Sequence, residues 1–350
     1  MKSHSALQDL VNRRLDALQF GPEERTIMFV PVACGLGGQI SGRVHTLALA
    51  LALGRKAVFP SLADPPYGQS FAPLHCAVAR SGDPGEVPLA EIATAQPDQA
   101  VRYDPQHMSI ESPGFGANLL TRVAEQLGAE IPERLLLEGL IFNWMKPAPA
   151  MAAHCQAVRR RLGIDDATLG VHFRRGDKTV ETAFVPAAEI NRQIATIHQR
   201  WAFTSLFLAS DSAHAPSEIE CPAGVRLIFD ADEKRYNNAN HKMLMASPEL
   251  AEEETRVAFR NIALLAACGG TVGQDNAHFA TLAAGAILAR EDRAERIVLI
   301  DGRFAQNRSP LLALWFRGKL AARALARRLF PHLTMRARTA RAASRQLPPA

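Results

Sequence analysis

Short apolar runs of strand length alternate with longer segments of helical spacing along most of the chain. The predicted strands are Ile27–Val32, Lys56–Phe59, Thr168–Arg174, Thr204–Ala209, Val225–Phe229, Gly270–Gly273 and Arg296–Ile300. The predicted helices are Val44–Leu53, Leu119–Leu127, Pro132–Leu140, Met151–Leu162, Ala187–Arg200, Glu249–Ala267 and His278–Leu288. Strands that alternate with helices are typical of parallel sheets covered by helices. The pattern predicts an α/β fold whose ligands bind at the carboxyl ends of the strands.

The length of the chain and one proline-rich segment predict two domains. A chain of 350 residues exceeds the size at which a single core usually divides. Lys146–Pro149 contains two prolines and cannot lie inside a helix or a strand, so it is the predicted linker. We therefore expect α/β domains over residues 1–148 and 149–302. Residues 61–115 are rich in Pro and Gly and predict loops that carry a binding surface.

The net charge of +5 hides a strong asymmetry. Residues 303–350 contain ten arginines, one lysine and no acidic residue, whereas the preceding residues contain 29 basic and 35 acidic ones. Because arginines are mixed there with apolar side chains, the segment predicts a basic amphipathic helix. One interpretation is binding to an anionic membrane surface, and the other is packing on the body of the protein. Nucleic acid is not an expected partner, because no recognition motif accompanies the charge.

Several features favour a cytoplasmic protein, either free or peripheral on the inner face of the membrane. The longest apolar run, Leu47–Leu53, is too short to span a bilayer. Charged residues, including Arg13 and Asp16, lie where a signal peptide would have its apolar centre. The five cysteines are scattered and form no C-x-x-C pair, which argues against a disulfide framework and a zinc site.

The most informative segment for chemistry is Gly170–Lys178, where a buried strand ends in charged residues. His172, Arg174, Arg175 and Lys178 fall within seven positions at the predicted carboxyl end of the strand. An arginine offers a planar fork to two phosphate oxygens and a lysine offers a point charge, so these cations suit a diphosphate. The alternative is a solvated charge cluster paired with Asp177.

Two acidic motifs carry weaker predictions. Glu181 follows the cations on the same loop and could act as a general base towards a sugar hydroxyl, or could be an ordinary solvated acid. Asp230-Ala-Asp232 follows a predicted strand and has the D-x-D pattern of some metal sites, but a strand-end turn is the favoured interpretation. We expect no metal.

The segment from His172 to Lys178, with Glu181, Phe184 and Pro186, resembles the first motif of the α-1,6-fucosyltransferases. Four further blocks follow the order of that family: Cys34–Gln39, Tyr67–Pro73, Trp144–Pro149 and Phe207–Asp211. The resemblance implies a GT-B-like pair of Rossmann-type domains with parallel sheets. It also implies inverting transfer of fucose from GDP-fucose to a glycan hydroxyl, without a metal or another cofactor. The acceptor would bind residues 1–148 and the donor residues 149–302.

The resemblance also assigns roles to residues. His172 would contact the guanine side, Arg174 and Lys178 would bind the diphosphate and stabilise its charge during the reaction, and Glu181 would be the catalytic base. Arg175 matches a second arginine of the motif, and the strand-end Asp211 is a further candidate for donor binding.

Two other positions depart from the family pattern. Asn261 stands where the family has a guanine-reading aspartate, and Gly273–Asn276 replaces a serine-rich phosphate loop. Gln274 and Asn276 could still bind the sugar or a phosphate. These departures leave two alternatives open: a glycosyltransferase that uses another nucleotide sugar, and a catalytically silent protein that binds a sugar nucleotide or a glycan.

Overall fold

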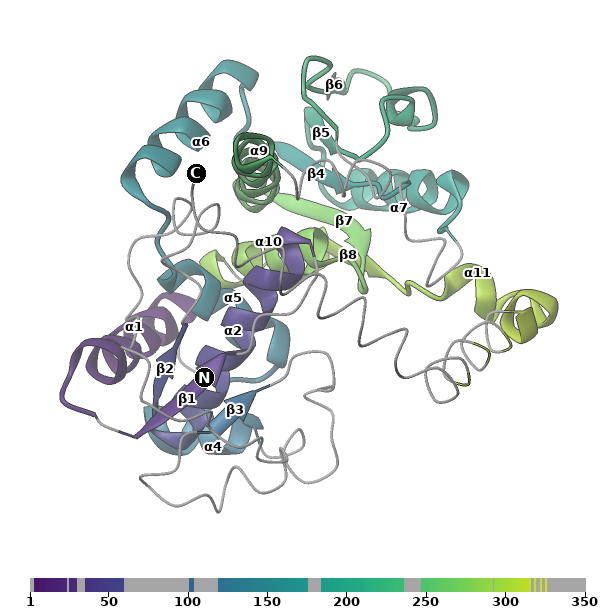
Figure 1. Ribbon diagram of the computed structural model, residues 1–350. Coiled ribbons are helices and arrows are strands. Elements are labelled where there is room, and N and C mark those ends of the chain that lie inside the picture. The colour runs from purple at the N-terminus through teal and green to yellow at the C-terminus, as the bar shows by residue number, and fades with distance from the viewer. Residues whose placement is uncertain are drawn as a thin grey trace. The chain divides into compact units, whose positions relative to one another are not determined.

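The computed structural model contains two parallel β-sheets with helices packed around them (Figure 1). It describes residues 3–23, 25–29, 35–59, 101–103, 119–175, 184–235, 247–291 and 293–315, together with Gly318, Ala322 and Leu325. Residues 1–177 and 186–301 form one compact unit, and residues 178–185 and 302–350 form a second. The predicted α/β class with parallel sheets is confirmed. The predicted boundary at residues 148 and 149 stays a prediction.

The N-terminal sheet has three parallel strands in the order β2-β1-β3. Its strands are β1 (Thr26–Phe29), β2 (Lys56–Val58) and β3 (Val101–Tyr103). Helix α2 (Leu36–Leu53) connects β1 to β2, as a crossover between parallel strands requires. Helices α4 (Leu119–Leu127) and α5 (Arg134–Trp144) follow the sheet in the chain.

The prediction that helix α2 begins at Val44 is wrong. The helix begins at Leu36 and includes Gly37, Gly38 and Gly42. A Cβ atom added at Gly37 would lie only 2.8 Å from the ring of Phe279, so this glycine permits a close approach between helices. A glycine inside a helix costs about 1 kcal/mol relative to alanine. The burial of nearly all of α2 offsets that cost.

Helix α1 (His4–Phe20) was not predicted, although its sequence carries the signals for it. The side chain of Ser3 caps the helix by accepting a hydrogen bond from the backbone N–H of Ala6. Leu7, Val11, Leu15 and Leu18 recur every three or four residues and are all buried.

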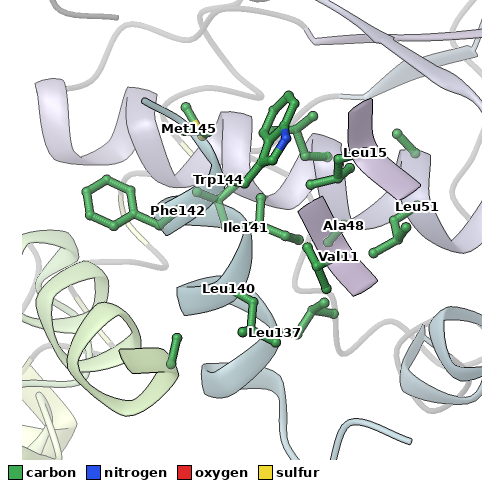
Figure 2. Close-up of a cluster of buried hydrophobic side chains, with 14 of the residues drawn as sticks. Val11, Leu15, Ala48, Leu51, Leu137, Leu140, Ile141, Phe142, Trp144 and Met145 are labelled. Atoms are coloured by element: carbon green, nitrogen blue, oxygen red, sulfur yellow. The ribbon is translucent and has the colours of Figure 1, made fainter. Parts of the chain in front are cut away.

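Helices α1, α2 and α5 share one apolar core (Figure 2). The labelled side chains come from all three helices: Val11, Leu15, Ala48, Leu51, Leu137, Leu140 and Ile141. Trp144 closes the core, and its indole N–H donates a 2.9 Å hydrogen bond to Asp16. Trp144, which stands at the start of a block that resembles the fucosyltransferase family, is therefore a core residue that anchors the end of α5.

The C-terminal sheet has five parallel strands in the order β6-β5-β4-β7-β8. They are β4 (Thr168–His172), β5 (Ser205–Ala209), β6 (Arg226–Ile228), β7 (Gly270–Gln274) and β8 (Ile297–Ile300). The chain builds the sheet outward from β4 in one direction, then returns to the other side of β4 with β7. This is the doubly wound order, and the direction reverses between β4 and β7.

Helices α6 (Pro149–Leu162), α7 (Ala187–Arg200), α9 (Pro248–Ala266) and α10 (His278–Arg290) belong to the C-terminal sheet. Two short 3₁₀ turns, η4 (Ala215–Ser217) and η5 (Ala294–Arg296), complete the connections. Helix α10 also crosses α5 of the N-terminal part at a pair of glycines. A Cβ added at Gly139 would clash with the carbonyl oxygen of Gly285, so the two backbones touch there.

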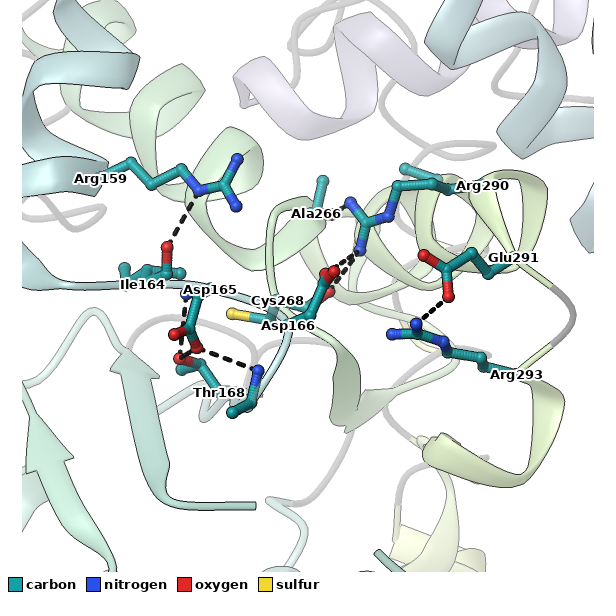
Figure 3. Close-up of polar contacts among 12 residues, drawn as sticks. Arg159, Ile164, Asp165, Asp166, Thr168, Ala266, Cys268, Arg290, Glu291 and Arg293 are labelled. Atoms are coloured by element: carbon teal, nitrogen blue, oxygen red, sulfur yellow. Dashed lines mark hydrogen bonds and ion pairs between the residues drawn. The ribbon is translucent and has the colours of Figure 1, made fainter.

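Polar side chains at the amino edge of the C-terminal sheet bind backbone atoms (Figure 3). Arg159 donates to the carbonyl of Ile164 at 3.0 Å, and Arg290 donates to the carbonyls of Ala266 and Cys268 at 2.9 and 2.6 Å. The carboxylate of Asp165 accepts from the backbone N–H of Ala167 at 2.9 Å. These contacts close the turns and helix ends that lead into β4 and β7.

The second unit contains the short helix α11 (Phe304–Asn307) and a further helical segment over residues 310–315. Within it the guanidinium of Arg308 lies over the ring of Phe304, 4.3 Å from the centroid. In the described part of the chain, no helix has the length and apolar character needed to cross a membrane.

Candidate functional site

The carboxyl ends of β4, β5 and β7 meet at one edge of the C-terminal sheet. His172 is the last residue of β4 and is paired in register with Ala209, the last residue of β5. On the other side of β4, Val171 is paired with Val272, two residues before the end of β7. Because the strand order reverses between β4 and β7, this edge is where a doubly wound sheet binds its ligand.

The side chain of His172 is buried beside an aromatic ring. Its imidazole stacks on Phe279 with 5.3 Å between ring centroids and 29° between planes. Phe279 belongs to the first turn of α10 and is also the ring that approaches Gly37 of α2. The glycine-rich start of α2 and the end of β4 therefore both contact the same phenylalanine. Phe279 was missed at the sequence level, because only the fold brings it to His172.

Ser210 and Asp211 hold the residues that follow β4. The hydroxyl of Ser210 donates to the carbonyl of Phe173 at 2.6 Å, and a carboxylate oxygen of Asp211 accepts from the backbone N–H of Arg175 at 2.7 Å. A hydrogen bond to a charged acceptor is among the stronger contacts in proteins. In the structure Asp211 positions the arginine loop, and its direct contact with a donor stays a prediction.

The two arginines of the loop follow β4 and are both half-buried. The guanidinium of Arg175 donates to Glu218 at 2.6 Å and lies over the ring of Phe173, 4.1 Å from its centroid. This ion pair compensates part of the charge of Arg175. The binding of a diphosphate by Arg174 and Arg175 stays a prediction.

Helix α9 brings Asn261 to the same edge of the sheet. The backbone N–H of Gly269 donates to Thr168 at the start of β4, and a Cβ added at Gly170 would contact Leu265. The helix thus runs antiparallel to β4. Asn261 lies one turn, about 5.4 Å, before Leu265 and so near the level of His172.

Asn261 is part of a buried charged cluster that includes a carboxylate. Its amide nitrogen donates to Glu233 at 2.9 Å, and the guanidinium of Arg260 donates to the other oxygen of Glu233 at 2.5 Å. Burial raises the pKa of Glu233 and outweighs the opposing effect of Arg260. A carboxylate therefore stands beside the asparagine, supplied by the loop after β6. The only sign of this carboxylate in the sequence was the position of Glu233 shortly after the predicted strand Val225–Phe229.

Asp230, the first residue of the D-x-D motif, belongs to the same cluster. Its carboxylate lies 3.5 Å from Arg260 and 3.2 Å from Arg161 of α6. These ion pairs give Asp230 a structural role at the end of β6, in agreement with the strand-end interpretation. Within the described ranges, no three His, Cys, Asp or Glu side chains are grouped as a metal site would require.

Gln274 and Asn276 lie at the end of β7, next to β4. Gln274 is buried and paired in register with Ile300 of β8, and its carbonyl accepts from the backbone N–H of Ala277, which begins the turn into α10. Asn276 is half-buried in that turn. The structure therefore brings together His172, Arg174, Arg175, Asp211, Asn261, Gln274 and Asn276 at or near one edge of the sheet.

Two of the predicted catalytic residues, Lys178 and Glu181, lie outside the described residues. The same holds for Cys34 and for the block Tyr67–Pro73. The catalytic base and the lysine contact with the diphosphate stay predictions.

No protein-family model matches this chain, and no curated protein matches it. Solved structures that match this chain include a mutant of Arabidopsis thaliana FUT1 in complex with GDP, at 12% identity and a TM-score of 0.49, over 81% of this chain and 76% of that one. They also include NodZ α-1,6-fucosyltransferase soaked with GDP-fucose, at 17% identity and a TM-score of 0.41, over 74% and 91% of the two chains. A third is POFUT1 in complex with GDP, at 13% identity and a TM-score of 0.43, over 80% and 99%.

Proposed function

We propose that this protein is an inverting glycosyltransferase that transfers fucose from GDP-fucose to a hydroxyl group of a glycan, without a metal. The proposal rests chiefly on the end of β4, where a motif that resembles the α-1,6-fucosyltransferases lies next to the reversal of strand order. In a doubly wound sheet, that position is the expected place for a nucleotide. The motif places a histidine and two arginines there within four residues.

In the proposed reaction, fixed cations replace a metal ion. Arg174 and Lys178 hold the diphosphate and stabilise the negative charge that grows on GDP as its bond to the sugar breaks. Glu181 accepts the proton of the acceptor hydroxyl. The oxygen of that hydroxyl attacks the anomeric carbon of fucose from the side opposite the leaving GDP. The attack inverts the configuration at that carbon. Asp211 contributes by fixing the backbone of Arg175, next to Arg174.

The guanine base is proposed to lie between His172 and the cluster on α9. Asn261 replaces the aspartate of the family, but its neighbour Glu233 supplies a carboxylate. A carboxylate has about four lone-pair sites, so Glu233 can accept from Asn261 and Arg260 and still accept from the amino group of a guanine. The second candidate function is a glycosyltransferase that uses a nucleotide sugar other than GDP-fucose, because Asn261 itself carries no charge.

A thermal-shift series with GDP, UDP and ADP separates the donor classes. A ligand that binds only the folded state at 100 times its dissociation constant adds about 2.7 kcal/mol to the free energy of unfolding. We expect GDP to raise the melting temperature and the other two to leave it nearly unchanged. Stabilisation by UDP or ADP alone would favour the second candidate.

Incubation with labelled GDP-fucose and a panel of chitooligosaccharides, lipid-linked sugars and lipopolysaccharide cores then tests transfer. The wild-type protein should label at least one acceptor. Glu181→Gln should bind GDP normally and transfer nothing, whereas Glu252→Gln, an exposed position on α9, should transfer at the normal rate. GDP binding without transfer to any acceptor would favour a silent binding protein. Full activity of Glu181→Gln would mean that another group is the base.

A further inference from the structure

We propose that residues 303–350 bind the surface of an anionic lipid bilayer. The first observation is the location of exposed apolar side chains. Six large hydrophobic residues are exposed in the described part of the chain, and five of them lie between residues 311 and 325. Leu311 is 80% exposed and Leu314 is 69% exposed. A cluster of this kind in so short a segment indicates a surface that binds something.

The second observation is the spacing of these residues. Residues 311–315 are helical, and so are Gly318, Ala322 and Leu325, all three of which are exposed. Within the contiguous helical residues 310–315, Leu311, Leu314 and Trp315 stand at positions i, i+3 and i+4, which is the spacing of one face of a helix. These three exposed apolar side chains therefore share a face, and Leu312 lies beside it.

The third observation is charge. The segment has eleven cationic side chains and no anionic one, whereas the preceding residues carry a net negative charge. A bilayer that contains anionic lipids attracts such a segment, and each lysine or arginine near its surface strengthens binding about fivefold. The rest of the protein would not contribute to that attraction. Charge and apolar surface together provide the two signals that stable binding to a membrane surface requires.

The same two properties disfavour other occupants of this surface. A second copy of the segment could cover the leucines, but it would bring eleven further cations against the first eleven. A nucleic acid would satisfy the cations, but its phosphate backbone offers nothing to the exposed leucines. A bilayer surface satisfies both, because the apolar face enters the boundary between headgroups and acyl chains while the cations stay among the headgroups.

Flotation of the full-length protein with lipid vesicles tests the proposal. We expect it to float with phosphatidylcholine vesicles that contain about one third phosphatidylserine, and to bind pure phosphatidylcholine vesicles at least about 100-fold more weakly. Trp315 is an internal probe, because its indole is 56% exposed and should move to an apolar environment on binding. Its fluorescence should shift to the blue with the anionic vesicles, and the shift should vanish in Trp315→Phe.

Two sets of variants separate the contribution of the apolar side chains to vesicle binding from that of the arginines. Each set has a matched control. Leu311→Ser combined with Leu314→Ser should weaken vesicle binding at least about tenfold. The control is Phe20→Ser, an apolar residue of α1 that is 60% exposed, and it should bind normally.

Replacing Arg323, Arg327 and Arg328 by glutamine should weaken vesicle binding on the order of 100-fold. The same replacement of Arg13, Arg160 and Arg200, which are exposed on helices of the first unit, should have little effect. All variants should keep the thermal shift with GDP, so that loss of membrane binding and loss of the proposed function are distinguishable.

Three results would overturn the proposal. The first is an absence of flotation with anionic vesicles, and the second is an equal loss of binding in the variants and their controls. The third is a different occupant: tighter binding to duplex DNA than to vesicles at the same salt concentration, or a dimer in solution that the two leucine replacements dissociate.

Discussion

The two edges of the five-stranded sheet carry the same kinds of side chain but use them differently. At the amino edge, Arg159 and Arg290 donate to backbone carbonyls, and Asp165 accepts from a backbone N–H (Figure 3). At the carboxyl edge, His172 stacks on a ring at the strand end and Arg174 follows it, next to the reversal of strand order. The residue type of an arginine therefore does not by itself indicate a functional role, because Arg159 and Arg290 bind backbone carbonyls. The position of Arg174 at the carboxyl edge is what makes it a candidate for binding a ligand.

Arg175 and Asp211 show that the carboxyl edge also contains residues that support it. Arg175 pairs with Glu218, and Asp211 binds the backbone of Arg175. The comparison therefore separates two roles that the structure shows, stabilising the fold and positioning the loop, from the proposed role of Arg174 in binding a ligand. Substitutions at the two edges should have different effects on stability and on kinetics.

The largest effect should come from Arg174→Ala. Removing one cation that stabilises developing charge should lower kcat/KM for the proposed transfer by about 1000-fold, equivalent to about 4 kcal/mol. Arg174→Lys should recover part of the activity, because it restores the positive charge. Steady-state kinetics at a temperature where each variant is folded provides the measurement. Normal kinetics in Arg174→Ala would contradict the proposal that the donor binds at the carboxyl edge of the C-terminal sheet.

Arg290→Ala is the matched change at the amino edge. It deletes two hydrogen bonds to backbone carbonyls, at a side chain that is about one-third exposed, so the free energy of unfolding should fall by about 2 kcal/mol. Urea denaturation measures the loss. The value of kcat/KM at a temperature where the variant is folded should equal that of the wild type. A large kinetic defect would show that the two edges are not separable.

Glu233→Gln should change how stability depends on pH. Burial raises the pKa of Glu233 in the folded protein, so the folded state keeps this proton at pH values where the unfolded state has lost it. The free energy of unfolding of the wild type should therefore fall as the pH rises from about 4.5 through the raised pKa, by at most about 1.4 kcal/mol per pH unit. The free energy of unfolding of Glu233→Gln should lack this fall with pH. Parallel curves of the free energy of unfolding against pH for the two proteins would contradict the raised pKa.

The smallest effect should come from Asp211→Asn, compared with Asp165→Asn at the opposite edge. An asparagine oxygen can still accept from the N–H of Arg175, but the bond loses its charge, which costs about 1 kcal/mol. Because Asp211 positions the arginine loop, kcat/KM should fall about fivefold to tenfold. Asp165→Asn should lower the melting temperature and leave the kinetics unchanged. Equal kinetic effects of the two variants would show that Asp211 does not position the loop.

The sequence predicted the C-terminal sheet well because local pattern and fold agree there. The prediction for Ala187–Arg200 matches α7, and the strand predictions fall on β4, β5, β6, β7 and β8 within two residues at each end. Each of these segments has a short apolar run or a regular helical period, with turn residues at its ends. The convergence of His172 and Asp211 followed from the same pattern, because parallel strands end at one edge.

The sequence predicted the N-terminal part less well, for a physical reason. The helix over Val44–Leu53 was predicted eight residues too short, because glycines are rare inside helices, whereas Gly37 lies inside α2 and permits contact with Phe279. Neither that contact nor the bond between Glu233 and Asn261 has a local signal, because each joins elements that only the tertiary fold brings together.

The crossing of α5 and α10 at Gly139 and Gly285 limits how the site can move. The first turn of α10 carries Phe279, which stacks on His172, and the middle of the same helix is in backbone contact with α5. Because no side chain separates the two backbones at Gly139 and Gly285, α10 cannot move closer to α5 there. The backbone at Phe279 is therefore held in place by a contact on the same helix that involves no side chain of the site.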